Sequence, residues 1–162
     1  MAETLSVTDM LPNRFEPKRS YRWVLAIEGI DSFLIKGTAR PTFTIGNTKI
    51  DFINSYRYVA GKLDMGNINV TLHDPIAPSG AQQVMEWVRT HYESVSGRAG
   101  YADFYKRDIQ LKMLDPIGTV IELWDIKGAF ITSAGFGSLE YSGDNIMEIS
   151  LTLQFDNCVL QY

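Results

Sequence analysis

The segment Met147–Asp156 (MEISLTLQFD) alternates apolar and polar side chains without interruption. A period of two is the pattern of a β-strand that has one face in a core and the other face in water. Such a strand requires a sheet with one apolar and one polar face. Because the segment ends close to the C-terminus, we expect this strand to lie near an edge of its sheet. The inward side chains are Met147, Ile149, Leu151, Leu153 and Phe155.

Shorter segments of the same kind precede it, separated by turn residues. Tyr21–Glu28 and Ser32–Ala39 predict a hairpin, and Asn67–Leu72 alternates as strictly as the last segment. Further strands are predicted over Ile109–Leu114 and Val120–Ala129. Turn signals recur at intervals of about 8–12 residues, which is typical of all-β domains. We therefore predict a mainly β fold, an antiparallel barrel or sandwich.

One segment, about residues 80–95, has a helical period instead. Ser79 and Gln82 have the spacing of a capping box, which marks the start of the helix. Trp87 and His91 fall on a flank, and Gly97 is expected to end the helix. We expect this single helix to pack on one side of the sheet. The predicted contact stripe is Ala81, Val84, Met85, Val88 and Tyr92.

A second distinctive segment, about residues 42–65, is rich in Ile, Phe, Tyr and Thr. Polar residues such as Asp51 and Arg57 interrupt any single core face, so we predict a long β-hairpin that projects from the body. Its turn is expected at Gly46-Asn47. Extended apolar strands aggregate unless they are paired or covered. The hairpin therefore predicts self-assembly between copies of the chain.

The length of 162 residues, 18.3 kDa, fits one domain over residues 1–162. Residues 1–20 contain Pro12 and Pro17, show no clear period, and are predicted to form an N-terminal arm. No apolar run approaches the roughly 20 residues of a membrane helix, so no membrane insertion is expected. The first residues have no apolar signal-peptide core, which favours synthesis in a cytoplasm. A single cysteine, Cys158, excludes an internal disulfide.

The net charge of −4 is unevenly distributed and argues against a general nucleic-acid binder. Between Met113 and Tyr162 there are seven acids and one base, Lys127. One interpretation is a solvated acidic face, and the other is a surface that meets a basic partner. The N-terminal basic residues of another copy are a candidate for that partner. These residues are Arg14, Lys18, Arg19 and Arg22.

The residues that usually carry catalysis form no recognisable constellation. His73 and His91 lack metal-binding spacing, and no nucleophile motif surrounds Cys158. Gly135-Phe136-Gly137 lacks the third glycine of a dinucleotide loop and is interpreted as strand or bulge glycine. Acidic pairs such as Glu122 and Asp125 are weak evidence for acid–base chemistry. We predict that the protein is not an enzyme and has no catalytic, cofactor or metal site.

Three segments of the chain, in this order, resemble phage tail tube proteins of contractile-tailed phages. The first is the strand pair YRWVLAIEGIDSFLIKGTARPTFTI, which leads into a proline. The second is the strand end INVTLHDP followed by the helix QVMEWVRTHY. The third is ELWDIKGAFITSAGFGSLEYSGDNIMEISLTLQFD, which ends on the alternating strand. Related tubes of contractile injection systems and type VI secretion share this fold.

The resemblance implies a structural subunit whose hexameric rings stack into a hollow tube for DNA passage into the host. The implied partners are other copies, a tail sheath protein, a tape-measure protein and a baseplate tube initiator. DNA would pass without sequence-specific binding. The implied location is the virion tail, after assembly in the host cytoplasm. The family has no catalytic residues to transfer to this chain.

The outward side chains of the last strand are the candidates for the lumen, because acids and neutral polar groups do not hold phosphate. These are Glu148, Ser150, Thr152, Gln154 and Asp156. Hairpin and arm residues are the candidates for ring stacking. These are Ile50, Phe52, Ile53, Tyr56, Tyr58, Arg14, Lys18 and Arg19. The alternative functions are a tube subunit of a contractile injection or type VI-like apparatus, and a small-ligand-binding β-barrel.

Overall fold

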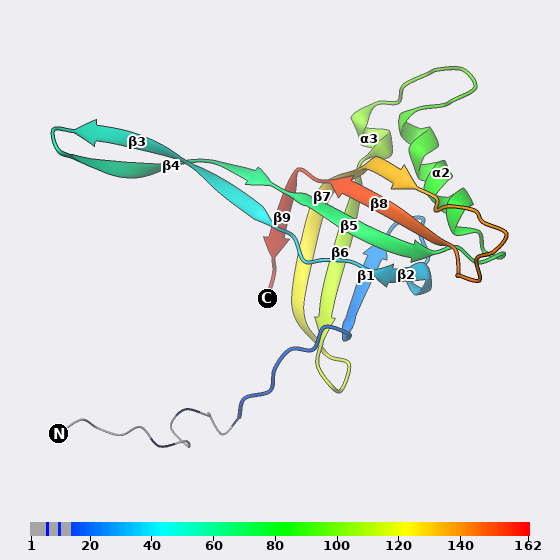
Figure 1. Ribbon diagram of the computed structural model, residues 1–162, viewed down its shortest axis with the longest axis horizontal. Helices are drawn as coiled ribbons and strands as arrows, with labels where there is room; N and C mark the ends of the chain where they lie inside the picture. The colour runs from blue at the N-terminus through cyan, green and yellow to red at the C-terminus, as the bar shows by residue number, and fades with distance from the viewer. Residues whose placement is uncertain (1–5, 7–9, 11–13) are drawn as a thin grey trace.

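The computed structural model describes residues 6, 10 and 14–162 (Figure 1). Residues 1–5, 7–9 and 11–13 of the predicted arm lie outside the described residues. β-Strand is the commonest regular structure in the described chain. The elements are β1 (Trp23–Ile27), η1 (Ser32–Leu34), β2 (Ile35–Gly37), β3 (Phe43–Phe52), β4 (Ser55–Met65), β5 (Asn67–His73), α2 (Gly80–His91), α3 (Ala102–Tyr105), β6 (Arg107–Leu114), β7 (Val120–Gly135), β8 (Glu148–Gln154) and β9 (Asn157–Leu160).

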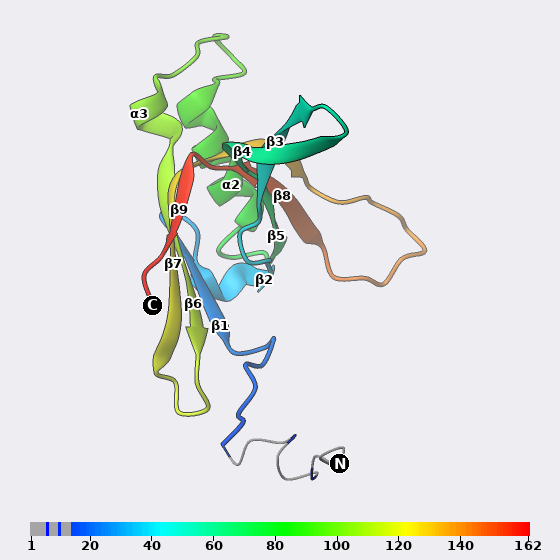
Figure 2. The same ribbon diagram turned by 90° about the vertical axis from the view of Figure 1, so that its left-hand side faces the viewer.

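Seven strands form one antiparallel sheet that curls into a nearly closed barrel, as Figures 1 and 2 show. The strand order is β1-β6-β7-β8-β5-β2, and β9 also pairs with β7. The strands β3 and β4 form a separate two-stranded sheet that extends away from the body. This arrangement confirms the predicted fold class: an antiparallel barrel with one main helix and a projecting hairpin. Among the described residues, no helix has the length and apolar character needed to cross a membrane.

The strand β7 forms the corner of the barrel. Its first half pairs with β6 on one side and β9 on the other, and its second half, from Phe130, pairs with β8. Gly128 lies at this change of partner with a φ of +68°, a conformation that favours glycine. A Cβ at Gly128 would lie 2.3 Å from a carboxylate oxygen of Asp156, so a side chain there would displace the Asp156 carboxylate.

The core lies inside the curled sheet and is closed on one side by α2. Its fully buried side chains include Leu25, Leu72, Ile126 and Ile149. The helix contributes Val84 and Trp87 to it. The prediction that Trp87 lies on a flank of the helix is wrong. The contact stripe is centred on Trp87, whose indole N–H donates to the Tyr105 carbonyl at 2.7 Å.

The start of α2 is as predicted, but its end is not. The amide of Gln82 donates to the Ser79 hydroxyl at 3.4 Å, which is the expected cap. The helix ends at His91 rather than near residue 95, because Tyr92 adopts an extended conformation. Tyr92 then forms a bridge with Ala99, so residues 92–99 make a small reversing loop.

The predicted hairpin between the first two strands is wrong. β1 pairs with β6, with Leu25 opposite Leu111, and β2 pairs with β5. Between them, residues 32–34 form a turn of 3₁₀ helix in which Leu34 is buried and Phe33 is exposed. The two strands therefore lie at opposite ends of the sheet path, joined only by residues 28–34. Local turn signals do not reveal these long-range partners.

The projecting hairpin is confirmed, but its turn lies elsewhere. The chain reverses at Ile53-Asn54, where Ile53 has a φ of 48°. Gly46, predicted to be in the turn, instead lies at an irregularity of register between Ile45 and Asn47. β3 therefore continues past the expected turn to Phe52, and β4 begins at Ser55.

The alternating last segment is confirmed as a strand, β8, with Ile149, Leu151 and Leu153 buried. The expected edge position is wrong, because β8 lies between β5 and β7 in the middle of the sheet. The chain bends after Phe155 and adds β9, which lies along the first half of β7. The segment closest to the C-terminus is therefore a short additional strand, and the alternating strand before it is internal.

Candidate functional site

The outward face of β8 continues across its neighbours as one polar surface, here called the polar face. Directly opposed residues of antiparallel strands share a face. On β5, Asn69 opposes Thr152 and Thr71 opposes Ser150. On β7, Ser133 opposes Thr152. The strands thus present rows of hydroxyl and amide groups over a buried apolar layer. The polar face comprises Glu148, Ser150, Thr152, Gln154, Asn67, Asn69, Thr71, His73 and Ser133.

Hydrogen bonds fix several of these side chains. The Thr152 hydroxyl donates to Asn69 Oδ1 at 3.2 Å, and the Gln154 amide donates to the Met65 carbonyl at 3.2 Å. Each of these bonds links β8 to β5 or to the base of the hairpin. The polar face is therefore an ordered surface of neutral groups on the central strands.

The one carboxylate that the polar face carries is neutralised within the chain. Glu148 forms an ion pair with Lys36 of β2. Asp156, predicted to share the outward face of β8, lies beyond the strand end and pairs with Lys106 at 2.7 Å. The hydrogen bond from Lys106 to Asp156 raises the pKa of Lys106, against an opposing effect of burial. Four of the five lumen candidates therefore share one surface, and its character is neutral rather than acidic.

The hairpin candidates all lie on exposed positions of β3, β4 and their turn. Register places Ile50 and Phe52 on one face, and Tyr56 and Tyr58 on the other. The two tyrosine rings meet edge to face at 5.8 Å between centroids, and the Lys49 ammonium lies 3.8 Å from the Tyr56 centroid. Ile53 at the tip is 87% exposed. Both faces of the hairpin thus carry apolar groups that no described part of the chain covers.

The N-terminal basic candidates separate into two kinds. Lys18 forms an ion pair with Glu122, whose side chain is only 5% exposed. Arg14 and Arg19 are exposed, and no acidic partner is found for them among the described residues. Lys18 therefore holds the arm to the body, and the two arginines remain available for other contacts.

Glu122 is the buried charge that sequence reasoning missed. It lies on the core side of β7 and accepts hydrogen bonds from Lys18 and the Trp124 indole, with Arg40 at 3.5 Å. Burial alone would raise the pKa of Glu122, but these donors and the positive charges of Lys18 and Arg40 together lower it. The phase of β7 contained the signal, because Glu122 falls in register with the inward residues Trp124 and Ile126.

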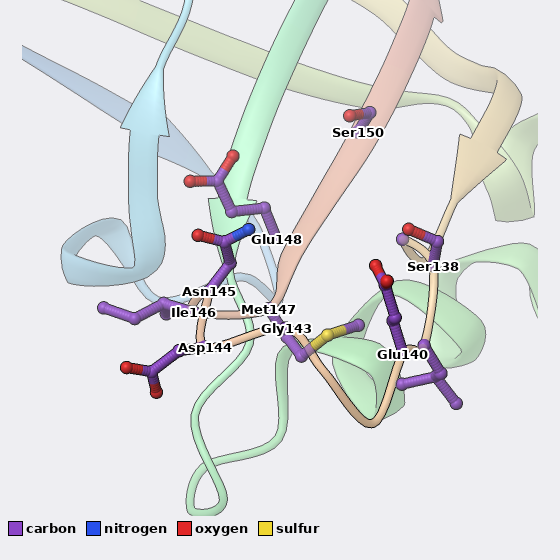
Figure 3. Close-up of a pocket in the computed structure, with 11 residues that line it drawn as sticks. Ser138, Glu140, Gly143, Asp144, Asn145, Ile146, Met147, Glu148 and Ser150 are labelled. Atoms are coloured by element: carbon purple, nitrogen blue, oxygen red, sulfur yellow. The ribbon is translucent and has the colours of Figure 1, made fainter.

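The loop between β7 and β8, residues 136–147, encloses an open hollow (Figure 3). Ser138 and Glu140 lie on one arm of the loop, and Asp144 and Ile146 on the other. Glu140 accepts a hydrogen bond from the Ser142 hydroxyl, and Gly137 has a φ of +83°. Of the glycines interpreted as strand or bulge residues, Gly135 ends β7, whereas Gly137 lies in this loop, so a strand does not continue here.

The two histidines and the cysteine do not come together as a reaction centre. The His91 ring packs edge to face on Tyr105 at 4.3 Å, away from His73 at the end of β5. Burial raises the pKa of the Cys158 thiol, which disfavours the thiolate. Over the described part of the chain, no three His, Cys, Asp or Glu side chains come together in a way that could hold a metal ion.

No family model and no curated protein sequence matches the chain. Solved structures share its fold. A chain of the anti-feeding prophage cap, the AFP tube terminating cap, is 18% identical with a TM-score of 0.74, over 97% of this chain and 99% of that one. A chain of the PVC sheath-tube complex of an extracellular contractile injection system is 16% identical with a TM-score of 0.68, over 98% and 99%. A type six secretion system protein is 11% identical with a TM-score of 0.51, over 86% and 82%.

The fold is therefore one found in tube and cap components of contractile injection systems. This confirms the likeness to tail-tube-like proteins that the sequence predicted. At these identities the comparison establishes the fold, and the functional interpretation depends on the surfaces described above.

Proposed function

We propose that the chain is a structural, non-enzymatic tube subunit, one domain over residues 1–162, whose copies form rings that stack into a hollow conduit. The observation that carries this proposal is the pairing of two surfaces on one small barrel. The polar face is ordered and neutral, as a conduit lining would be. The hairpin carries exposed apolar side chains on both faces, and these need cover from other copies.

Ring closure follows from the open edges of the sheet that bears the polar face. One edge is β2, and the other is the second half of β7, residues 130–135, beside which no described strand lies except β8. Edge-to-edge pairing of different strands on neighbouring copies is a heterologous contact, which closes into a ring when the rotation allows. The resemblance to tail tubes implies that this ring is hexameric.

The lining candidates in this arrangement are Glu148, Ser150, Thr152 and Gln154, with Asp156 at the rim. Each lysine or arginine that contacted a phosphate would add a salt-dependent attraction for DNA. A lining of hydroxyls and amides, with Glu148 already paired to Lys36, gives passing DNA little to bind. This supports a conduit in which the cargo slides without sequence-specific binding.

The hairpin and the arm are the proposed contacts between successive rings. Ile50, Phe52 and Ile53 would pack against the next ring, and Tyr56 and Tyr58 would cover the opposite side of the hairpin. We also propose a sheath and a baseplate as partners, since structures of similar fold come from sheath-tube and baseplate assemblies. The tape-measure protein, the tube initiator and a location in a virion tail come from the sequence resemblance.

A second candidate, the tube of a contractile injection apparatus, is favoured by one observation. The similar chains come from the anti-feeding prophage and the PVC injection system. Particles purified from the source organism distinguish the two. A DNA-filled head attached to the tail supports the phage tail, and headless sheathed particles support the injection apparatus.

Negative-stain microscopy of the purified protein tests the proposal directly. Rings or tubes of uniform diameter are expected, with assembly increasing with concentration. A monomer that persists at high concentration would contradict it and would favour the small-ligand barrel.

A further inference from the structure

Most of the acids in the last third of the chain already have partners within the chain. Asp115 accepts backbone N–H bonds from Ile117 and Thr119 in its own turn. The other acids with partners each form an ion pair. These pairs are Glu122 with Lys18, Asp125 with Lys127, Glu148 with Lys36 and Asp156 with Lys106.

Two acids remain, and both lie on the loop of residues 136–147. Asp144 has no partner among the described residues, and Glu140 accepts only from the neighbouring Ser142 hydroxyl. The same loop exposes Leu139, which is 88% accessible, together with Tyr141 and Ile146. A projecting loop that combines large apolar side chains with unpaired acids has the character of a protein contact surface rather than a solvated turn.

The N-terminal segment of residues 14–21 has the complementary character. Arg14 and Arg19 are its exposed bases without an acidic partner in the described chain. Phe15 and Tyr21 are each 70% exposed beside them. The ion pair of Lys18 with Glu122 fixes where this segment leaves the body. The segment thus offers two arginines and two aromatic rings from an anchored base.

These two surfaces do not meet within one copy. The two views place the loop on one side of the body and the N-terminal segment on another, beyond the lower end of β1 (Figures 1 and 2). We infer that the loop of residues 136–147 is the docking site for residues 14–21 of a second copy of the chain. This inference rests on the proposed function, because it assigns one of the contacts between assembled subunits.

The chemistry of the contact follows from the groups involved. Arginine binds carboxylates through a planar fork of donors and also stacks on aromatic rings. Glu140 and Asp144 stand on opposite arms of the loop, so two arginines can each reach one carboxylate (Figure 3). The apolar side chains of both surfaces would then be covered together. Because different surfaces of two copies meet, the contact is heterologous and can repeat around a ring or along a stack.

Charge exchange tests the inference. The loop variant carries Glu140→Lys and Asp144→Lys, and the arm variant carries Arg14→Glu and Arg19→Glu. Each alone is expected to raise the concentration needed for half-assembly by about tenfold or more, because like charges across an interface repel. The exchange variant carries all four substitutions, keeps the wild-type net charge, and is expected to restore assembly.

In a matched control, the charge reversal is made at two exposed acids elsewhere in the chain, and the loop acids are kept. Glu86→Lys and Asp103→Lys, combined with the arm reversal, give the same net charge as the exchange variant but are expected to leave assembly impaired. Sedimentation velocity measures assembly, and circular dichroism checks the fold of each variant. Wild-type assembly is also expected to weaken between about 0.05 and 0.5 M salt.

The outcomes separate this inference from the proposed function. If wild-type protein assembles but either reversal has no effect, or the folded exchange variant fails to recover, the docking site is overturned and the tube function stands. Assembly indifferent to salt over this range also counts against the docking site. If wild-type protein does not self-associate at all, both are overturned.

Discussion

Glu122 is a carboxylate on the core side of a strand, and its surroundings explain why it is tolerated there. Its partners are Trp124 on its own strand and two residues from distant parts of the chain, Lys18 in the N-terminal segment and Arg40 before the hairpin. A buried charge is costly unless it is paired and hydrogen-bonded. Glu122 therefore ties the arm and the base of the hairpin to the same point of the barrel.

Replacing this carboxylate should cost stability in a pH-dependent way. Glu122→Gln is expected to lower the free energy of unfolding by about 1–3 kcal/mol at neutral pH, because charge-assisted bonds are lost. The folded pKa of Glu122 lies below its unfolded value of about 4.3, so the contribution is present above that pH. It is lost as the pH falls through the folded pKa. Urea unfolding at neutral and acidic pH measures the difference.

The control for this prediction is Glu140→Gln, which removes an exposed carboxylate. Its effect is expected to stay within about 0.5 kcal/mol at either pH. A wild-type advantage over Glu122→Gln that does not shrink at any acidic pH at which both proteins stay folded would contradict the assigned role of the carboxylate.

A substitution at Gly128 tests the backbone constraint at the corner of the barrel. Gly128→Ala places a Cβ in a left-handed conformation with a φ of +68° and against the Asp156 carboxylate. We expect a loss of about 1–3 kcal/mol of unfolding free energy. Gly37→Ala is the matched control. No atom lies within 4 Å of a Cβ placed at Gly37, and the φ there lies outside the left-handed region. Equal unfolding midpoints for the two variants would show that the corner is not constrained in this way.

At the scale of elements, the predictions that rested on local chemistry succeeded, and those that needed distant partners did not. Ser79 caps the helix because its hydroxyl accepts a nearby backbone N–H, which sequence spacing reveals. The partner of β1 is β6, with Ile27 opposite Ile109 and Trp23 opposite Met113, and no turn signal encodes a pairing over that distance in the sequence. Gly46 is a third case. Glycine favours turns, but Gly46 lies within β3 at an irregularity of strand register.

The same distinction applies to the candidate site. Alternation placed Glu148, Ser150, Thr152 and Gln154 on one face, because a period of two is a property of any strand. It also placed Asp156 with them, since the bend that ends β8 has no signal in the pattern. The ion pairs with Lys36 and Lys106, which change the charge of this region, depend on tertiary contacts and were not predictable.

The hairpin is the element whose removal should separate folding from assembly. Replacing residues 47–62 by Asn-Gly removes the distal hairpin and keeps the directly paired Ile45 and Leu63. We expect a folded, soluble subunit with a cooperative unfolding transition and no tubes in negative stain. The reason is that residues 47–62 lie outside the core cluster but hold the exposed Ile50, Phe52 and Ile53. Tubes formed at the wild-type concentration would remove the hairpin from ring stacking.

At the scale of the whole molecule, the distribution of charge is the property that a conduit would use. The chain carries a net charge of −4, yet the polar face has one carboxylate, paired with Lys36. Within the last third of the described chain, the unpaired acids lie instead on the loop of residues 136–147. Avoidance of DNA by this face would thus arise from the lack of unpaired cations on it more than from acidic repulsion.

Adding cations to the polar face is therefore the sharpest test of the conduit lining. Ser150→Lys with Thr152→Lys leaves the Glu148–Lys36 pair in place and puts two new positive charges on β8. We expect tubes to form but to retain DNA, with retention falling steeply between about 50 and 200 mM salt. A control with Gln110→Lys and Asn157→Lys adds the same charge at exposed positions of β6 and β9. If DNA passes the Ser150→Lys, Thr152→Lys tubes as freely as the control tubes, the polar face does not line the lumen.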